Sequence, residues 1–376
     1  MQENTELNRE ISNEEIQKAV GIINRLFSYY NSKVVGQPGL GYSLLVAMMT
    51  NGHVLLESVP GLAKTTAARV MTEAVNGSFS RIQCTPDLIP SDIIGTQMYN
   101  MATNTFEDKI GPVYSNFVLL DEINRSSAKT QSAMLEAMQE REVSIGGKTY
   151  KLPEVFVVIA TQNPIESEGT YVLSEAQLDR FLLKETLTYP NPADEIEILN
   201  RVESDVFTNI SAVASMEDVL YLQKLCRRVY IDPAIKKYIV DIVQASRNTD
   251  KFMDPKLAQY VAMGASTRAA IAFMETAKAV ALINGRRYCV PDDVKALRYS
   301  VLRHRIMLTF AAVADNRCDR RCCKDSIAYG TDRRWRMELL QREQVKIYED
   351  DICPSHTGQY ERHEDDLHDK GDIKDN

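Results

Sequence analysis

Long apolar runs are absent from this 376-residue chain, and Leu44–Met49 is typical of the longest. Such runs fall far short of the roughly 18 residues that a membrane span needs. The first residues, Met1–Glu15, are acidic and polar, which is not the pattern of a secretory signal. An excess of positive charge is also missing, because the formal net charge is −8. Nucleic-acid binders usually carry a basic surface. These absences predict a cytoplasmic protein without a membrane span and argue against a nucleic-acid partner.

Cysteine is sparse, with seven residues, and its spacing gives no sign of a disulfide or zinc framework. Three cysteines stand singly within apolar patterns and are expected to be small buried residues: Cys84, Cys226 and Cys289. The other four lie near the C-terminus and match no zinc-ligand pattern: Cys318, Cys322, Cys323 and Cys353. These four cysteines are therefore not expected to bind a metal ion.

The composition is that of a globular protein, with 44% hydrophobic and 26% charged residues, and the length allows two or three domains. Strand and helix patterns alternate from Val54 to Tyr189, which predicts an α/β fold with a parallel sheet. Glu142–Leu152 and Thr96–Ile110 read as β-hairpins. Beyond Pro192 the patterns are nearly all helical.

A phosphate-binding loop is indicated by His53–Thr66, which reads HVLLESVPGLAKTT. An apolar strand, a turn and then a helix that starts at a lysine place backbone N–H groups and a helix N-terminus around phosphates. Lys64 is expected to reach the outer phosphates, and the Thr65 hydroxyl to bind Mg²⁺. The predicted nucleotide-binding residues of the loop are Ser58, Val59, Pro60, Gly61, Leu62, Ala63, Lys64, Thr65 and Thr66.

Two positions of this loop depart from the pattern G-x-x-x-x-G-K-[ST], because Ser58 and Ala63 stand in place of glycine. Ala63 is expected to need no positive φ, since the residue before the lysine is already entering the helix. Ser58 would cost about 1–2 kcal/mol if its backbone were left-handed. An ordinary strand–turn–helix with a solvated lysine is the alternative.

Two further apolar runs end in polar residues that suit phosphate chemistry. Phe117–Glu122 predicts a buried strand whose carboxyl end presents Asp121 and Glu122. Asp121 is expected to hold Mg²⁺ through water, and Glu122 to orient and deprotonate the attacking water. Val155–Ala160 leads into Asn163, whose amide could bind the γ-phosphate or the water. The alternative for Asp121 and Glu122 is that they are solvated acids that only end a strand. The alternative for Asn163 is a local turn before a proline.

The order of these parts resembles the MoxR family of the AAA+ superfamily. The matching stretches are VPGLAKT, LLDEINR, KTQSAMLEAMQEREVSIGG, VIATQNPIESEGTY, LSEAQLDRFLLK, GASTRAA and VLRHRI. They extend over roughly Val34 to Leu308, with Ser58 and Thr267 replacing a usual glycine and proline. The resemblance implies an α/β AAA+ P-loop NTPase core, with a parallel sheet flanked by helices, and a smaller C-terminal all-α lid over the nucleotide.

The resemblance also assigns residues and partners. Arg180 matches the arginine finger that reaches the neighbouring subunit's site, and Arg268 matches the sensor-2 arginine that links the lid to the nucleotide. Without the family, either would be a surface ion-pair partner, and Arg125 is a weaker candidate for subunit contact. The resemblance implies an ATPase with ATP and Mg²⁺ as cofactors. It also implies a homo-oligomer, a hexameric ring, in which both hairpins project toward the central pore. Its implied clients are proteins, among them von Willebrand factor A domain proteins.

The predicted domains are 1–34, an N-terminal helical segment; 35–190, the nucleotide-binding domain; 191–310, the helical lid; and 311–376, a disordered or atypical tail. Two other functions stay open on the sequence. A nucleotide-dependent scaffold with little turnover would tolerate Ser58. A nucleic-acid motor would use Lys148 and Lys151 of the second hairpin, against the acidic balance of the chain.

Overall fold

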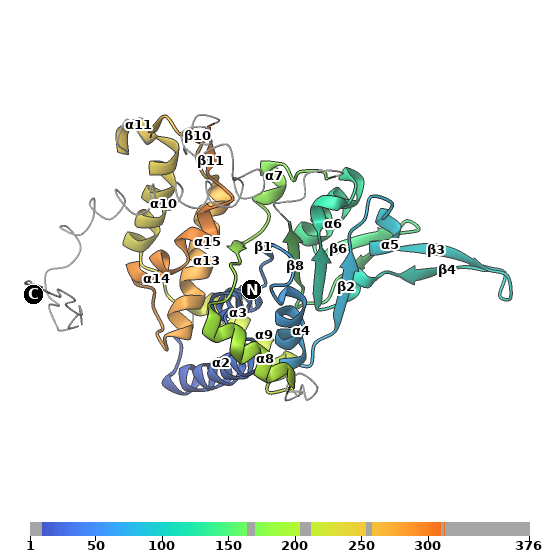
Figure 1. Ribbon diagram of the computed structural model, residues 1–376, viewed down its shortest axis with the longest axis horizontal. Helices are drawn as coiled ribbons and strands as arrows, with labels where there is room; N and C mark the ends of the chain where they lie inside the picture. Colours follow the sequence, from blue (N-terminus) through green and yellow to red (C-terminus); the bar gives the residue numbers. More distant parts are fainter. Residues whose placement is uncertain (1–9, 164–169, 204–211, 253–257, 310–311, 313–376) are drawn as a thin grey trace, which may run out of the picture.

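A five-stranded parallel sheet with the strand order β2-β5-β8-β1-β9 organises the fold (Figure 1). Its strands are β1 (Val54–Glu57), β2 (Phe79–Gln83), β5 (Phe117–Asp121), β8 (Val157–Gln162) and β9 (Leu183–Thr186). All five strands point the same way, so their carboxyl ends share one edge of the sheet, here called the carboxyl edge. Their starts share the opposite edge, the amino edge. The predicted α/β fold with a parallel sheet is confirmed.

The computed structural model describes residues 10–163, 170–203, 212–252, 258–309 and 312. The predicted tail, 311–376, therefore lies outside the described residues apart from Ala312. Among the described helices, none combines the length and apolarity needed to cross a membrane. The predicted domain boundaries stay predictions.

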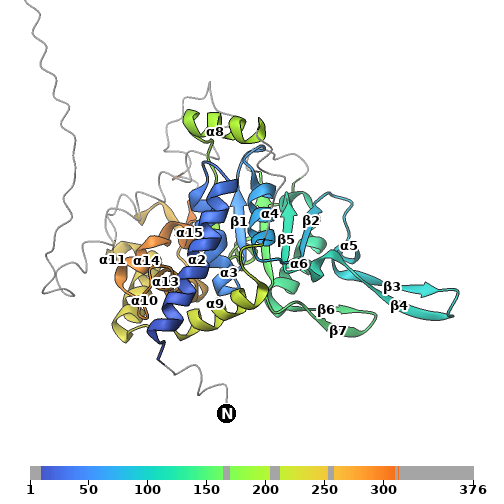
Figure 2. The same cartoon turned by 90° about the horizontal axis from the view of Figure 1, so that it is seen from below.

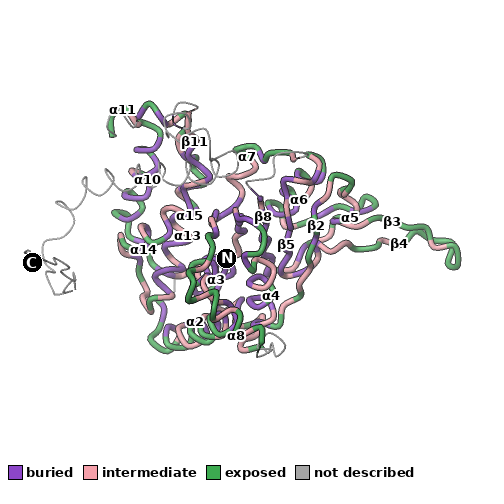
Figure 3. The backbone as a smooth tube through the Cα atoms, viewed as in Figure 1, coloured by how far each residue is buried: buried purple, intermediate pink, exposed green. Residues whose placement is uncertain are grey.

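Helices cover both faces of the sheet, which explains why its strands are continuous apolar runs rather than alternating ones. In β5, Phe117 and Leu119 join a core formed with α2, α3 and α4, whereas Val118 and Leu120 join a second core that includes α6. Figure 3 shows the resulting buried centre of the molecule. These helices are α2 (Asn13–Lys33), α3 (Pro38–Thr50), α4 (Lys64–Ala74) and α6 (Ala128–Glu140).

Two hairpins project from the sheet domain, as the sequence predicts (Figure 2). The turn between β6 (Glu142–Ile145) and β7 (Lys148–Lys151) contains two glycines with φ of 57° and 81°. The other hairpin consists of β3 (Gly95–Asn100) and β4 (Thr105–Ile110). Asp108 joins the two hairpins, because its carboxylate accepts hydrogen bonds from Lys148 Nζ at 3.1 Å and Tyr150 Oη at 2.5 Å.

The helices from α9 to α15, here called the helical domain, do not cover the carboxyl edge. They pack on α2, α3 and β9, and Gln223 Nε2 donates to the Met48 carbonyl at the end of α3 (2.8 Å). Figure 2 shows this domain beside α2, away from the loop after β1. The predicted C-terminal all-α domain is therefore confirmed, but it packs beside the sheet domain and does not lie over the loop after β1, as a lid over the nucleotide would. Its helices are α9 (Met216–Arg228), α10 (Pro233–Arg247), α11 (Thr249–Phe252), α13 (Thr267–Ile283), α14 (Pro291–Ala296) and α15 (Arg298–Leu302).

Local sequence signals set several helix ends in this domain. Ser215 caps α9 with a capping box, Pro233 occupies the first turn of α10, and Gly285, with φ of 68°, follows α13. A small antiparallel pair, β10 (Val261–Met263) and β11 (Met307–Leu308), interrupts the helical pattern. The remaining described elements are α5 (Pro90–Ile94), α7 (Glu175–Leu178), α8 (Pro192–Glu203) and 3₁₀ turns at Pro112–Tyr114 and Ile123–Arg125.

Candidate active site

The loop between β1 and α4 leaves the sheet at the carboxyl edge. Ser58, the first departure from the glycine pattern, is fully buried, and its N–H donates to the Gln162 carbonyl of β8 at 3.1 Å. Its φ is not positive. The backbone cost considered for Ser58 therefore does not arise, because this position continues the sheet instead of turning.

The strained position of the loop is Ala63, with φ of 53° and ψ of 25°. The prediction that the residue before the lysine needs no positive φ is wrong. A left-handed alanine costs about 1–2 kcal/mol, which explains the preference for glycine here. Ala63 is also the N-cap of α4, and no side chain caps this helix end. The first turn of α4, which holds Lys64, Thr65 and Thr66, thus begins with backbone N–H groups suited to an anion.

Asp121 ends β5 at the same edge and is held from two sides. Its Oδ2 accepts bonds from Arg81 Nη2 at 2.6 Å and Nε at 3.2 Å, and its Oδ1 accepts from Thr161 Oγ1 at 2.8 Å. Neither partner was predicted from the sequence. No spacing signal could reveal Arg81, because it lies on β2 and meets Asp121 only through the pairing of β2 with β5.

Glu122 follows Asp121 and has a left-handed backbone, with φ of 58°. Its N–H donates to Thr161 Oγ1 at 2.8 Å, so one hydroxyl fixes both acids. The Glu122 carboxylate accepts from Arg125 Nη1 at 3.0 Å and from Gln83 Nε2 at 3.3 Å. From the sequence, Arg125 is a candidate for contact with another subunit, but its side chain lies beside Glu122 of its own chain. Strain of this kind concentrates at functional sites.

Asn163 follows β8 and is buried at the carboxyl edge. Because β8 lies between β5 and β1, about two strand spacings, or roughly 10 Å, separate the two acids from the loop after β1. The structure therefore brings Lys64, Thr65, Asp121, Glu122 and Asn163 to one edge.

This edge fits a nucleoside triphosphate with Mg²⁺. An open helix N-terminus, a lysine, a hydroxyl and a carboxylate are the groups that hold phosphates and Mg²⁺. In the described ranges, no cluster of three or more His, Cys, Asp or Glu side chains could hold a metal ion alone. Mg²⁺ suits such a site, because it is usually bound by one or two carboxylates together with phosphates and water.

Arg180 and Arg268 lie at the amino edge, where they line a cavity of about 560 Å³. Its other lining residues include Asn51 and Pro153, which precede β1 and β8. The fold therefore places the two arginines near each other and away from Lys64. Arg268, predicted to bind nucleotide, lies on the opposite edge from the Lys64 of its own chain, because the helical domain packs there.

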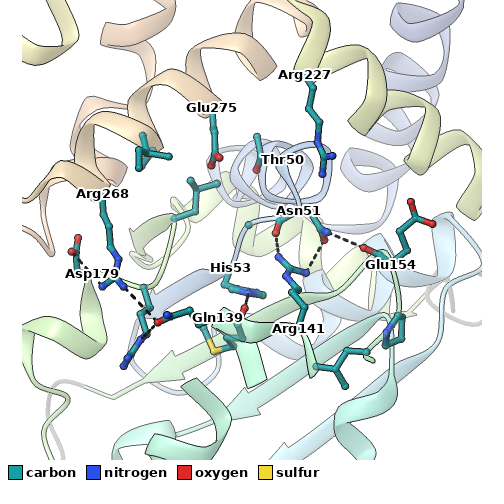
Figure 4. Close-up of a pocket in the computed structure, with 18 of the residues that line it drawn as sticks. Thr50, Asn51, His53, Gln139, Arg141, Glu154, Asp179, Arg227, Arg268 and Glu275 are labelled. Carbon is teal, nitrogen blue, oxygen red and sulfur yellow. Dashed lines mark hydrogen bonds and ion pairs between the residues drawn. The ribbon is translucent and has the colours of Figure 1, made fainter. Parts of the chain in front are cut away.

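The cavity lies between the sheet domain and the helical domain and is rich in positive charge (Figure 4). Burial raises the pKa of the Glu275 carboxyl, and the nearby Arg227 opposes this shift. Six basic and three acidic side chains line it: Arg141, Lys151, Arg180, Arg227, Arg268, Arg305, Glu154, Asp179 and Glu275.

Comparisons with known proteins agree with this geometry. Residues 53–183 match the model of the ATPase family associated with various cellular activities (AAA), and residues 257–320 match the AAA lid domain. The chaperone MoxR1 of Mycobacterium tuberculosis is 47% identical over 282 residues, which cover 75% of this chain and 74% of that protein. The MoxR protein of Paracoccus denitrificans is 30% identical over 300 residues, covering 74% and 86%. A crystal structure of a candidate ATPase from Cytophaga hutchinsonii superposes with a TM-score of 0.76 at 44% identity, covering 82% and 93%.

Proposed function

This chain belongs to the MoxR family of AAA+ ATPases, and we propose that it hydrolyses ATP with Mg²⁺ as a ring that remodels or matures protein clients. Support comes from the two edges of the sheet. The carboxyl edge gathers groups for phosphate, metal and water, whereas Arg180 lies at the amino edge. A chain divided in this way completes its site only when the amino edge of another copy meets its carboxyl edge.

At the carboxyl edge, each of the chain's own residues has a separate role. Lys64 and the N–H groups of the first turn of α4 hold the phosphates, while Thr65 and Asp121 hold Mg²⁺, which neutralises phosphate charge when bound. Glu122 takes a proton from the attacking water, and Asn163 orients this water or the γ-phosphate. The Thr161 hydroxyl holds both positions, because it donates to the Asp121 carboxylate and accepts from the Glu122 backbone N–H.

At the amino edge, Arg180 and Arg268 face the γ-phosphate of the neighbouring subunit. A guanidinium at this position offsets charge that develops during transfer and is worth about 10³–10⁵ in rate in related enzymes. Head-to-tail contact of this kind forms a ring when the rotation between copies closes, and we propose a closed hexamer.

The clients are proposed to be proteins, and the β3–β4 hairpin supports contact with a polypeptide. Large apolar side chains are exposed along it, which is unusual for a solvated hairpin: Met98, Tyr99, Met101 and Phe106. The name of the Mycobacterium tuberculosis relative includes "chaperone". Partners with a von Willebrand factor A domain remain a proposal from the family, because fold alone does not fix function.

The substitution Glu122→Gln tests the proposed function. It should preserve ATP binding and lower phosphate release by about 10²–10⁴-fold, the usual contribution of a general base. Glu136→Gln, at an exposed position of α6, is the matched control and should leave both unchanged. Undiminished turnover in Glu122→Gln would remove the assigned base. A wild-type chain that binds ATP without releasing phosphate would favour the scaffold instead.

A further inference from the structure

Arg180 and Arg268 belong to different parts of the molecule but share one hydrogen-bond acceptor. Arg180 lies just before β9, and Arg268 lies in the first turn of α13 in the helical domain. Gln139 Oε1 accepts from Arg180 Nε at 2.9 Å and from Arg268 Nη2 at 3.5 Å. Figure 4 shows Gln139 and Arg268 reaching toward each other across the cavity. Two positively charged groups are thereby held side by side.

A second set of bonds fixes the elements that carry these arginines. Asp179 Oδ2 accepts from Ser266 Oγ, the N-cap of α13, at 2.7 Å. Its Oδ1 accepts from Arg305 Nε at 2.8 Å. Asp179 precedes Arg180, and Ser266 lies two residues before Arg268. The Asp179 carboxylate therefore ties the backbone next to one arginine to the helix end next to the other.

Arg305 makes this junction rigid because its side chain is buried and fully engaged. The residue is only 6% exposed, and its guanidinium also donates to the carbonyls of Phe181 at 2.6 Å and Leu182 at 3.1 Å. Burial lowers the pKa of Arg305, and the bond to Asp179 opposes this shift. A buried charge with these partners is costly to displace. The helical domain is thus fastened to the segment that carries Arg180.

We propose that Gln139 and Asp179 are positioning residues that hold Arg180 and Arg268 as one anion-binding pair, aimed at the nucleotide of the neighbouring subunit. This inference rests on the proposed function. The neutral amide of Gln139 suits the role for a physical reason. It accepts from both guanidinium groups without adding a negative charge beside them. Arg268 is already partly neutralised by Asp179, whose Oδ2 lies 3.9 Å from its Nη1, so a neutral acceptor preserves the positive charge that remains for a phosphate. A carboxylate at this position would form ion pairs with the arginines and compete with the phosphate.

The substitution Gln139→Glu tests the inference. Gln139 is exposed at the end of α6, so the fold should be preserved. Its ATP affinity should match that of the wild type, because the chain's own loop after β1 is untouched. Its turnover at saturating ATP should fall tenfold or more. Gln139→Leu, which removes the acceptor without adding charge, should cost less. Gln17→Glu adds the same charge at an exposed position of α2 and should have no effect.

Mixed assemblies supply a readout that a merely structural role would not change. Gln139→Glu chains keep an intact carboxyl edge, and Glu122→Gln chains keep an intact arginine pair. A mixture of the two should release phosphate faster than the sum of the separate preparations. Additive activity in mixtures of proven assembly would overturn the inference.

Arg180→Ala separates failure of this inference from failure of the proposed function. If Arg180→Ala loses turnover while Gln139→Glu stays within twofold of wild type, Gln139 does not position the pair and the inference fails alone. If Arg180→Ala keeps full turnover, the proposed action across the subunit interface fails, and the inference fails with it.

Discussion

The two edges of the sheet position their functional groups in different ways. At the carboxyl edge, two residues of the candidate site, Ala63 and Glu122, have left-handed backbone, with φ of 53° and 58°. Left-handed residues also line the cavity at the amino edge, Asn51 and Arg141, but the arginine pair there is ordered by side-chain contacts with Gln139 and Asp179. A phosphate-binding turn needs backbone N–H groups in fixed directions, which only backbone conformation can supply. A pair of arginines binds an anion through its side chains, so hydrogen bonds to these side chains are enough to position it.

The largest effect is expected where the two edges must cooperate. Arg180→Ala should lower turnover by about 10³-fold or more, and Lys64→Ala should abolish ATP binding. Mixed in equal amounts, the two variants should recover part of the activity, because a Lys64→Ala chain still offers its arginines to the intact carboxyl edge of its neighbour. Phosphate release by the mixture, measured against each variant alone, checks this.

An inactive mixture is informative only if the chains assemble together. Mass measurements in the presence of ATP should therefore show mixed assemblies. Mixed assemblies without recovered activity would place both halves of the site in one chain and contradict the division of labour between the edges.

A smaller effect is expected from Arg81, which neutralises Asp121 from the neighbouring strand. In Arg81→Met, the carboxylate loses a competing cation, so Mg²⁺ should bind more tightly. The Mg²⁺ concentration for half-maximal turnover should fall by up to about fivefold, which corresponds to about 1 kcal/mol, the upper end for ion pairs in contact with solvent. Arg69→Met, which breaks an exposed pair with Glu73, is the control and should not change it. A higher Mg²⁺ requirement in Arg81→Met would mean that Arg81 orients Asp121 for the metal.

The smallest effect concerns the strained backbone of the carboxyl edge. Ala63→Gly should raise the free energy of unfolding by about 0.5–1 kcal/mol, because relief of the left-handed alanine outweighs the greater freedom of glycine in the unfolded chain. Ala133→Gly in the middle of α6 should lower it by about 0.5–1 kcal/mol, since alanine is preferred inside a helix. Thermal unfolding without nucleotide measures both. Equal losses in the two variants would show that Ala63 is not strained.

Much of the fold and part of the candidate site could be predicted from the sequence because their signals are local. The apolar run before Asp121 and Glu122 indicates a buried strand that ends in acids, and the pair Gly146–Gly147 indicates a hairpin turn. Both features depend on neighbours in the chain. The five-stranded parallel sheet follows from the alternation of such segments.

Other features could not be predicted, because they depend on contacts between distant segments. The positive φ of Ala63 results from how the loop joins β1 to α4, and the alanine itself gives no sign of it. Arg81 meets Asp121 only through strand pairing. The placement of Arg268 depends on where the helical domain docks, and the packing of α9 and α13 on α3 decides this. A motif can identify an arginine without showing which nucleotide it faces.

The docking of α9 and α13 on α3 has a consequence for how spent nucleotide leaves. In many two-domain enzymes, a hinge within one chain opens the pocket. In the part of this chain that the structure describes, the helical domain is fastened to the far side of the sheet through Asp179 and Arg305. Within the proposed ring, ADP would be released when adjacent copies part, so exchange would be timed by the contact between chains.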